Sequence, residues 1–344
     1  MIHQARKRTS GRSRLRLWSA GCLRALALSL VLLLSVLAPG FSAGRRESPA
    51  PVVSAPEPPA LTRTFAIVYP IVHPFFEPVT EMAIAYGRDR GVEIITRGPE
   101  STDVQQQIEI VESLIAMRVD GLALCATDPK ALTPLVNRAI DAGIPTIAFE
   151  SDMPESKRLC FLGTDNYKAG QHLAEVLARE LDFHGKAIIC TGLPTQMSLN
   201  QRIRGIQDTL AAKYPEIAII DLRTGKGDYA LTLRVIEEQI AAHPDFDSFT
   251  SIDATGGPAA VAIWKAKGWK GDRHKIITFD DMPANLAGIE AGIVNSVVSQ
   301  KQWTWGPLII DRLLDIIEGE SVPDYYDTGT VEITIENLDS YRQE

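Results

Sequence analysis

From residue 65 onward, short apolar runs alternate with segments in which apolar residues recur at helical spacing. The apolar runs hold Val, Ile, Leu and Phe at consecutive positions, which is typical of parallel strands buried on both faces of a sheet. They predict eleven strands, at 65–70, 92–96, 121–125, 145–149, 159–162, 186–191, 216–222, 248–252, 275–279, 293–299 and 331–335.

The intervening segments predict helices. Within 103–118, apolar residues from Val104 to Ile115 follow the spacing i, i+4, i+7 and i+11, as expected of a helix that buries one face. Helices are also predicted over 130–142 and 257–268, each with a glycine at its C-terminal end. Eleven strands are too many for one doubly wound sheet, so the pattern predicts an α/β protein with two such sheets, one in each domain.

Polar side chains directly follow several of the predicted strands. Glu150 and Asp152 come after one strand, and Asp253, Asp280 and Gln300 follow three later ones. In an open α/β sheet, ligands bind outside the carboxyl ends of the strands. We therefore expect these side chains to line one pocket, suited to a small polyhydroxylated molecule.

The first predicted strand runs directly into the sequence His73-Pro74-Phe75-Phe76, which opens a helix. Aromatic residues at a helix start are commonly part of a core, but these follow a strand end, where a ligand is expected. A sugar ring presents apolar C–H faces that pack on aromatic rings. Phe75 and Phe76 are therefore predicted to contact a ligand.

Several kinds of site are not indicated by the sequence. No G-x-G-x-x-G follows a predicted strand and no G-x-x-x-x-G-K-[ST] occurs, so the phosphate cradle of nucleotide-binding proteins is missing. Cys125, Cys160 and Cys190 are 30 or more residues apart, which excludes a CxxC motif, and their apolar surroundings indicate buried thiols. His73 belongs to no His-rich cluster. We expect neither a metal nor a cofactor.

Charge is distributed unevenly along the 344 residues. Nine of the 35 Lys and Arg residues and none of the 43 Asp and Glu residues lie in 1–46, which leaves 26 basic and 43 acidic residues in the rest of the chain. The body then has a net charge near −17. Such a charge argues against nucleic-acid binding, which requires a basic surface.

The basic start is followed by the apolar run ALALSLVLLLSVLA at 25–38 and then by small residues, an order typical of a secretory signal peptide. The run is shorter than the roughly 20 residues that span a bilayer. Residues 1–43 are predicted to be a signal peptide, with an uncleaved signal anchor as the alternative. In both cases the basic flank stays in the cytoplasm, so the body is exported to the periplasm or the outer face of the cytoplasmic membrane. The Pro- and Ala-rich segment 44–60 predicts an extended linker.

Seven motifs in a fixed order resemble the periplasmic sugar-binding proteins of ABC transporters, in the ribose-binding-protein branch shared with the ligand domains of LacI-type repressors. These motifs are HPFF (73–76), GLALCATDP (121–129), AGIPTIAFESDMPESKRLCFLGTDNYKAG (142–170), NQRIRG (200–205), HPDFDSFTSIDATGGPAA (243–260), ITFDDMP (277–283) and SVVSQ (296–300).

The resemblance covers about residues 61–340. It implies two doubly wound parallel-sheet lobes joined by three crossovers, with the ligand in the cleft between them. The implied lobe 1 comprises 61–163 and 301–328, and the implied lobe 2 comprises 164–300 and 329–344. The protein is expected to be a monomer.

The resemblance also implies roles for single residues. Phe75 and Phe76 occupy the place of the family's sugar-stacking aromatics, and His73 stands where the family often has Asn. Glu150 matches an Asp of the ribose binders, whereas Ser151 replaces the Arg that follows it there. The loss of that Arg argues against ribose itself.

In the second implied lobe, Arg202 matches the family's sugar-binding Arg, whose planar guanidinium donates a fork of hydrogen bonds. Asp280 and Gln300 match the family directly, and Asp253 replaces an Asn. Asp152 is expected to add a second carboxylate beside Glu150, unless it is an ordinary solvated loop acid.

Other residues near these motifs are more ambiguous. Asp165 and Asn166 are expected to cap a helix rather than to touch ligand. Tyr229 is the nearest candidate for the family's second-lobe aromatic. Trp303 and Trp305 either line the cleft or pack under the third crossover.

The function that these observations favour is an exported binding protein that captures a neutral monosaccharide, or a related polyol or nucleoside, and delivers it to an ABC permease. The alternative is a sensory binding protein that presents its closed form to a membrane receptor kinase or chemoreceptor. A third interpretation is an enzyme in which Asp253 and Asp280 are a glycosidase acid/base pair. It is disfavoured because the family resemblance and the export pattern are explained without catalysis. The identity of the sugar is left open.

Overall fold

A computed structural model describes residue 60 and residues 62–341 of the chain. The predicted signal peptide and nearly all of the predicted linker lie outside these residues. Among the described helices, none combines the length and the apolar character that crossing a membrane requires.

The first sheet contains six strands: β1 (Arg63–Val68), β2 (Val92–Arg97), β3 (Gly121–Leu124), β4 (Thr146–Phe149), β5 (Phe161–Gly163) and β11 (Tyr325–Asp327). Their order across the sheet is β11-β5-β4-β3-β1-β2, and every neighbouring pair is parallel. The helices of this lobe are η1 (Pro74–Phe76), α1 (Glu77–Asp89), α2 (Val104–Met117), α3 (Pro129–Asp141), η2 (Gln302–Thr304) and α9 (Trp305–Ile317).

The second sheet also contains six strands: β6 (Gly185–Thr191), β7 (Ile217–Thr224), β8 (Ser248–Ser251), β9 (Lys275–Phe279), β10 (Ser296–Ser299) and β12 (Val331–Ile333). Their order is β12-β10-β9-β8-β6-β7, the same pattern as in the first sheet. The helices of this lobe are α4 (Asn166–Glu180), α5 (Met197–Lys213), α6 (Tyr229–Ala242), α7 (Gly256–Lys267), α8 (Pro283–Glu290) and α10 (Leu338–Tyr341).

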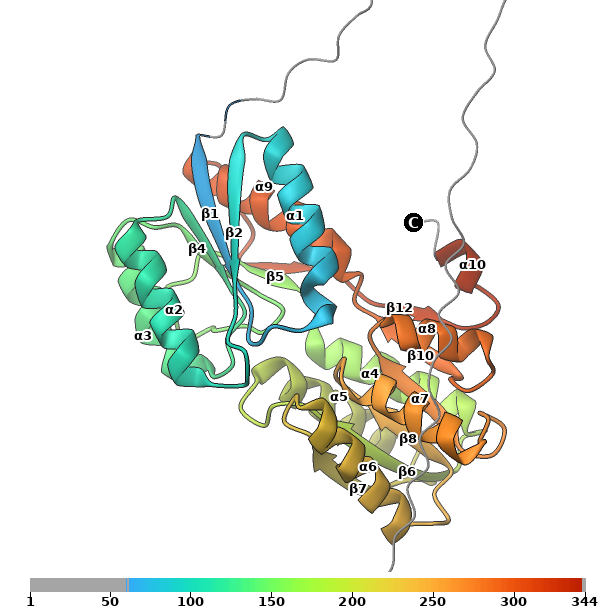
Figure 1. The fold of residues 1–344 in the computed structure, drawn as a ribbon. Coiled ribbons are helices and arrows are strands. Elements are labelled where there is room, and N and C mark those ends of the chain that lie inside the picture. The colour runs from blue at the N-terminus through green and yellow to red at the C-terminus, as the bar shows by residue number, and fades with distance from the viewer. Residues whose placement is uncertain (1–59, 61, 342–344) are drawn as a thin grey trace, which may run out of the picture. The chain divides into compact units, whose positions relative to one another are not determined.

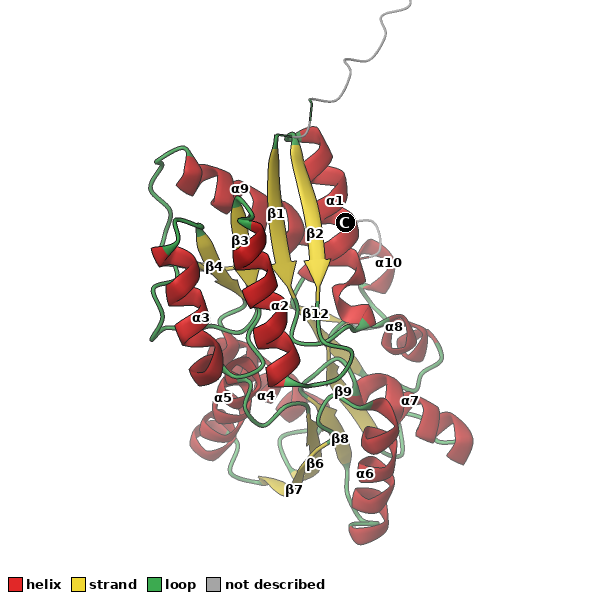
Figure 2. Cartoon of the chain, turned by 60° about the vertical axis from the view of Figure 1, so that its left-hand side comes forward, coloured by secondary structure: helices red, strands yellow, loops and turns green. Residues whose placement is uncertain are grey.

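Each sheet is covered by helices on both faces, because alternate residues of the buried strands point to opposite sides. In β1, Phe65 and Ile67 pack with residues of α1 and α9, whereas Ala66 and Val68 pack with residues of α2 and α3. The second sheet is built the same way, with α6, α7 and α8 on one face and α4 and α5 on the other. Figures 1 and 2 show these two layered lobes.

The chain passes between the two sheets three times: from β5 to α4, from β10 to η2, and from β11 to β12. The prediction of two doubly wound sheets is therefore confirmed, and each of the eleven predicted strands overlaps an observed one. Two details differ. The strand predicted at 331–335 forms β12, which pairs antiparallel with β10 at the sheet edge, and the short strand β11 was not predicted.

Candidate functional site

A pocket lies where strand ends of the two sheets face each other. Its volume is about 70 Å³. A cavity holds a water once this volume exceeds about 10–15 Å³, so the pocket has room for more than one water-sized group. Eight of the nine side chains predicted from the sequence line it: His73, Phe75, Phe76, Glu150, Arg202, Asp253, Asp280 and Gln300.

Each of these side chains is placed by the start of a helix, the end of a strand or, for Arg202, the first half of α5. Glu150 follows β4 of the first sheet and Asp280 follows β9, the corresponding strand of the second. Both residues have left-handed backbone conformations, with φ values of 60° and 68°. This conformation is uncommon for residues other than glycine, and here it turns the chain at the point where each carboxylate enters the pocket.

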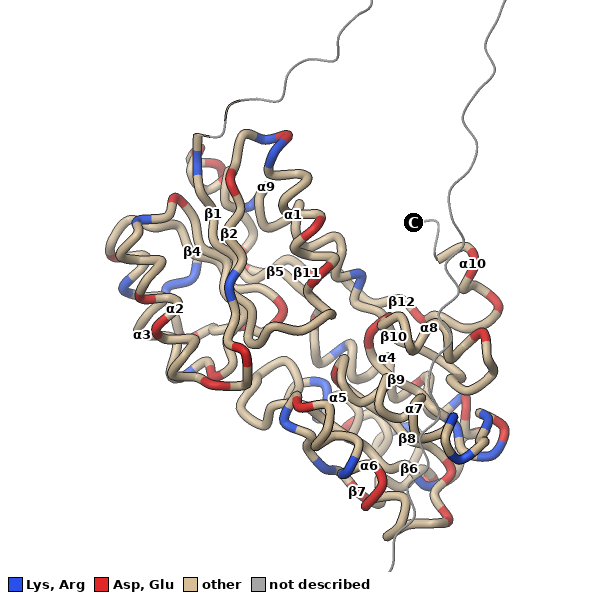
Figure 3. Tube along the Cα trace, viewed as in Figure 1, with Lys and Arg blue, Asp and Glu red and all other residues tan. Residues whose placement is uncertain are grey.

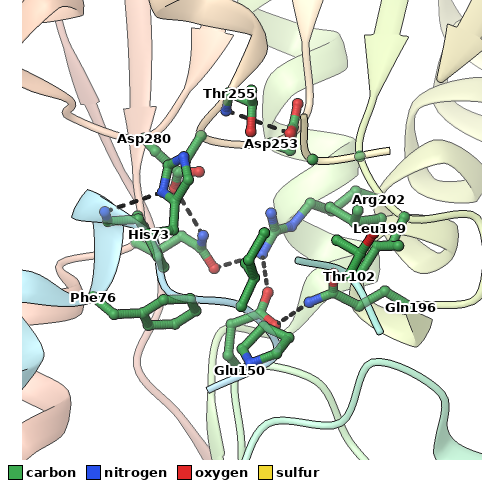
Figure 4. Close-up of a pocket in the computed structure, with 18 residues that line it drawn as sticks. His73, Phe76, Thr102, Glu150, Gln196, Leu199, Arg202, Asp253, Thr255 and Asp280 are labelled. Atoms are coloured by element: carbon green, nitrogen blue, oxygen red, sulfur yellow. Dashed lines mark hydrogen bonds and ion pairs between the residues drawn. The ribbon is translucent and has the colours of Figure 1, made fainter. Parts of the chain in front are cut away.

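Arg202 joins the polar groups of the pocket and is only 1% exposed. Its Nη2 donates to Glu150 Oε1 at 3.1 Å and to Gln300 Oε1 at 2.6 Å, while its Nε donates to Asn166 Oδ1 at 2.8 Å. Its guanidinium also lies over the Phe279 ring, 4.6 Å from the centroid. These contacts hold the guanidinium in one orientation, and Figure 4 shows it directed at the Glu150 carboxylate.

The ion pair between Glu150 and Arg202 connects the two lobes. Glu150 Oε2 also accepts hydrogen bonds from Gln196 Nε2 at 2.7 Å and from Cys125 Sγ at 3.0 Å. A further bond between the lobes runs from Thr195 Oγ1 to the carbonyl oxygen of Thr127, at 2.8 Å. The lobes are therefore linked by the protein's own side chains around the pocket.

The aromatic wall of the pocket comes from the first lobe. Phe76 stacks on Tyr69 with ring centroids 4.5 Å apart, and Phe75 meets Trp305 edge to face at 5.9 Å. Trp305 is fully buried behind this wall and does not line the pocket, whereas Trp303 packs against Tyr341. Trp305 Nε1 donates to Thr328 Oγ1 at 3.2 Å, in the third crossover, so packing beneath that crossover is the correct alternative for Trp305.

His73 acts as a neutral side chain at the mouth of this wall. Its Nδ1 accepts a hydrogen bond from the Phe75 backbone N–H at 3.1 Å, so the ring proton is on Nε2. Burial lowers the pKa of His73, although the Asp253 carboxylate acts in the opposite direction. His73 therefore offers the pocket an N–H donor without a positive charge.

Asp152 is the one predicted site residue that the structure does not bring to the pocket. It forms an ion pair with Arg158, whose Nη2 lies 2.9 Å from Asp152 Oδ2. Arg158 in turn binds Asp324 at 2.7 Å, beside β11. Asp152 thus fixes the loop between β4 and β5 to the edge of the sheet.

Other residues of the pocket were not predicted. Gln196, Thr255, Thr102 and Leu199 line it, although none directly follows a predicted strand. Tyr229, considered as a second-lobe aromatic, is 47% exposed and is not among the lining residues.

The remaining sequence expectations concern caps and thiols. Asp165 caps α4 by accepting from the Lys168 N–H, whereas Asn166 lies inside that helix and binds Arg202. The three cysteines of the described chain are buried and free, and burial raises the pKa of each thiol. Their expected burial is confirmed.

Burial raises the pKa of Asp280 to about 7, against the opposing effects of Arg202 and a hydrogen bond from Gln300. A carboxyl whose pKa is higher in the folded than in the unfolded state stabilises the fold at low pH, and that contribution is lost as pH rises from about 3.8 through about 7. The wild type is therefore expected to lose stability relative to Asp280→Asn between pH 4 and 7. Urea unfolding of both proteins at pH 4–8 measures this difference, and a difference that stays constant over the range contradicts the raised pKa.

Comparison with known proteins identifies the family. A family model described as a periplasmic binding protein domain matches residues 65–321. A D-ribose/D-allose-binding protein of Pseudomonas aeruginosa is 27% identical over 292 residues, which cover 81% of this chain and 89% of that protein.

Solved structures give the same result. An ABC transporter solute-binding protein from Burkholderia graminis, in complex with D-arabinose, has a TM-score of 0.77 and 31% identity, and the match covers 82% of this chain and 99% of that one. A carbohydrate transporter solute-binding protein from Agrobacterium radiobacter, also with D-arabinose, has a TM-score of 0.77 and 26% identity over 81% and 97% of the two chains. Since the family model matches well over half of the sequence, the chain belongs to the periplasmic binding proteins.

Proposed function

We propose that the protein is an exported solute-binding protein that captures a monosaccharide between its two lobes and delivers it to an ABC permease. The observation that carries this proposal is the pocket itself, in which two phenylalanines of one lobe face Arg202, Asp280 and Gln300 of the other. Aromatic rings match the C–H face of a sugar, and charged groups form short hydrogen bonds with its hydroxyls. The relatives named above bind ribose, allose or arabinose by their names, which supports the same ligand class here.

The proposed mechanism is hinge closure without a covalent step. We assign residues 61–163 and 301–328 to lobe 1, and residues 164–300 and 329–344 to lobe 2. Phe75 then belongs to lobe 1 and Asp280 to lobe 2, so a ligand held by both residues contacts both lobes. Such a ligand favours the closed state because some of its contacts require both lobes. The permease then recognises the closed form.

The test is a ligand screen with the mature protein. Thermal-shift assays with pentoses, hexoses, polyols and nucleosides identify candidates, since a ligand at 100 times its Kd adds about 2.7 kcal/mol to the free energy of unfolding. Calorimetry is then expected to give one site with a micromolar or lower Kd, equivalent to about −8 kcal/mol or better. Amino acids and inorganic anions serve as controls. If one of these binds and every monosaccharide fails, the proposed function is wrong.

A further inference from the structure

The charges that line the pocket do not balance. Three carboxylates, those of Glu150, Asp253 and Asp280, face one cation, Arg202, among the described residues of the lining. His73 adds no charge, because its Nδ1 is an acceptor and burial lowers its pKa. On the helices around the two sheets, by contrast, basic and acidic positions are interspersed (Figure 3).

The one cation is already paired. Arg202 forms its ion pair with Glu150, and both oxygens of that carboxylate accept hydrogen bonds from the protein. Arg202 reaches Asp280 only through Gln300, whose amide oxygen accepts from Arg202 and whose Nε2 donates to Asp280 Oδ1 at 2.8 Å. Arg202 is therefore paired directly with Glu150, and its charge does not prevent burial from raising the pKa of Asp280 to about 7.

Asp253 and Asp280 have no cationic partner in the described part of the chain, where no ion pair includes either residue. Asp280 is 2% exposed and lines the pocket, yet within the described residues its Oδ2 receives no hydrogen bond. Asp253 accepts only from neutral groups, Ser251 Oγ at 3.0 Å and the Thr255 N–H at 3.3 Å. An ionised carboxylate at the buried position of Asp280 is costly without a cation, and the partly buried Asp253 adds a second negative charge beside it, so a ligand that supplies a cation is favoured.

The two unpaired carboxylates are neighbours. Ser251 at the end of β8 pairs with Thr278 in β9, and each carboxylate follows two residues later. Because adjacent strands lie about 4.8 Å apart, Asp253 and Asp280 enter the pocket side by side. Their mutual repulsion contributes to the raised pKa of Asp280.

We propose that the pocket takes a monosaccharide or cyclic polyol that carries a protonated amine, with the ammonium group between Asp253 and Asp280. An ammonium donates three hydrogen bonds, enough for both carboxylates and one further acceptor. The aromatic wall then packs on the ring, and the His73 Nε2–H donates a hydrogen bond to one of its hydroxyls. This inference rests on the proposed function and narrows its ligand to one chemical class.

Matched ligand pairs test the proposal at pH 6.5. Calorimetry compares glucosamine, galactosamine, mannosamine and an inosamine with their parent sugars or inositol, and with the N-acetylated amines, which keep the nitrogen but not the charge. We expect at least one amine to bind tenfold or more tightly than its parent, and N-acetylation to abolish the advantage. The buffer must not be Tris, because Tris is itself an amino polyol.

Proton release provides a second readout. Burial raises the pKa of Asp280 to about 7, close to the pH of the titration, and an adjacent ammonium favours the ionised form of the carboxyl. Titrations in phosphate and in HEPES are therefore expected to report release of up to one proton per amine bound.

Variants of the two carboxylates provide a third readout, the affinity for an amine divided by the affinity for its parent sugar. Asp253→Asn and Asp280→Asn should each reduce this ratio at least fivefold. Asp89→Asn, at an exposed position in α1, is the matched control and should leave the ratio unchanged.

The possible outcomes separate the two proposals. The amine inference is overturned if the parent sugars bind as tightly as the amines, or if neither variant changes the ratio of amine affinity to parent-sugar affinity. Either result leaves the proposed sugar-binding function intact. Putrescine carries amines but no ring and no hydroxyls. If it binds as tightly as the best amino sugar, the pocket does not require the sugar or polyol portion of the proposed ligand. If neither the sugars nor their amines bind, the proposed function itself fails, and this inference fails with it.

Discussion

Arg202→Met is expected to abolish ligand binding and to lower the free energy of unfolding by about 3–5 kcal/mol, the usual cost of removing one partner of a buried ion pair. Met fills a similar volume but leaves the Glu150 carboxylate, 4% exposed, without its cation. It also leaves the side chains of Asn166 and Gln300 without their donor. Urea unfolding measures the stability, and calorimetry with the ligand found in the screen measures the affinity.

The same helix provides a control for this prediction. Arg204 lies two residues further along α5, its side chain is 78% exposed, and its ion pair with Asp208 is 3.5 Å long. Exposed pairs of this kind contribute about 0–1 kcal/mol, so Arg204→Met should leave affinity intact. The double variant Arg202→Met, Glu150→Gln should be more stable than Arg202→Met, because no uncompensated charge remains. If Arg202→Met retains wild-type stability, the ion pair between the lobes does not stabilise the protein.

Gly170→Ala is expected to destabilise the protein by about 2 kcal/mol or more, although alanine is the better helix former. Helices α4 and α5 approach so closely that a Cβ at Gly170 would lie 2.2 Å from the backbone oxygen of Arg202, and a Cβ at Gly205 would lie 2.2 Å from that of Tyr167. Helix propensity favours alanine by about 1 kcal/mol, whereas overpacking costs about 1–3 kcal/mol and occasionally more. A clash with backbone atoms belongs at the upper end of that range, because the helices must separate.

Gly170→Ala is also expected to affect ligand binding in the pocket. Separating α4 from α5 moves the backbone of Arg202, so Gly170→Ala should lower ligand affinity as well as stability. Gly205→Ala is expected to lower stability and ligand affinity in the same way. Gln207→Ala, at an exposed position on α5, should change stability by no more than about 0.5 kcal/mol. A Gly170→Ala protein more stable than the wild type would indicate that the helices separate without cost.

Local sequence pattern predicts the parts of this protein that local interactions determine. Continuous apolar runs locate the buried strands, and the residues that follow them, such as Glu150 and Asp280, enter the pocket because parallel strands end at a common edge. The strand β11 was missed because its sequence, Tyr325–Asp327, is short and partly exposed at a sheet edge. An edge strand need not be apolar, so it leaves little hydrophobic signal.

Partners distant in the sequence account for the other differences. Asp152 follows a strand end as Glu150 does, but it pairs with Arg158, which Asp324, 166 residues further along the chain, holds at the sheet edge. Gln196 lies in the loop after β6, and its role depends on Glu150, 46 residues away in the other lobe.

The left-handed backbone at Glu150 and Asp280 has a consequence for protein engineering. A residue other than glycine in this conformation costs about 1–2 kcal/mol, and each carboxylate is also buried. At 280, glycine removes both penalties together with the ligand contact, whereas at 150 it would also leave the buried Arg202 without its ion-pair partner. Selecting a library of this protein for heat resistance alone would therefore enrich glycine at 280 and yield stable proteins that no longer bind their ligand, so any such selection must include ligand capture from the first round.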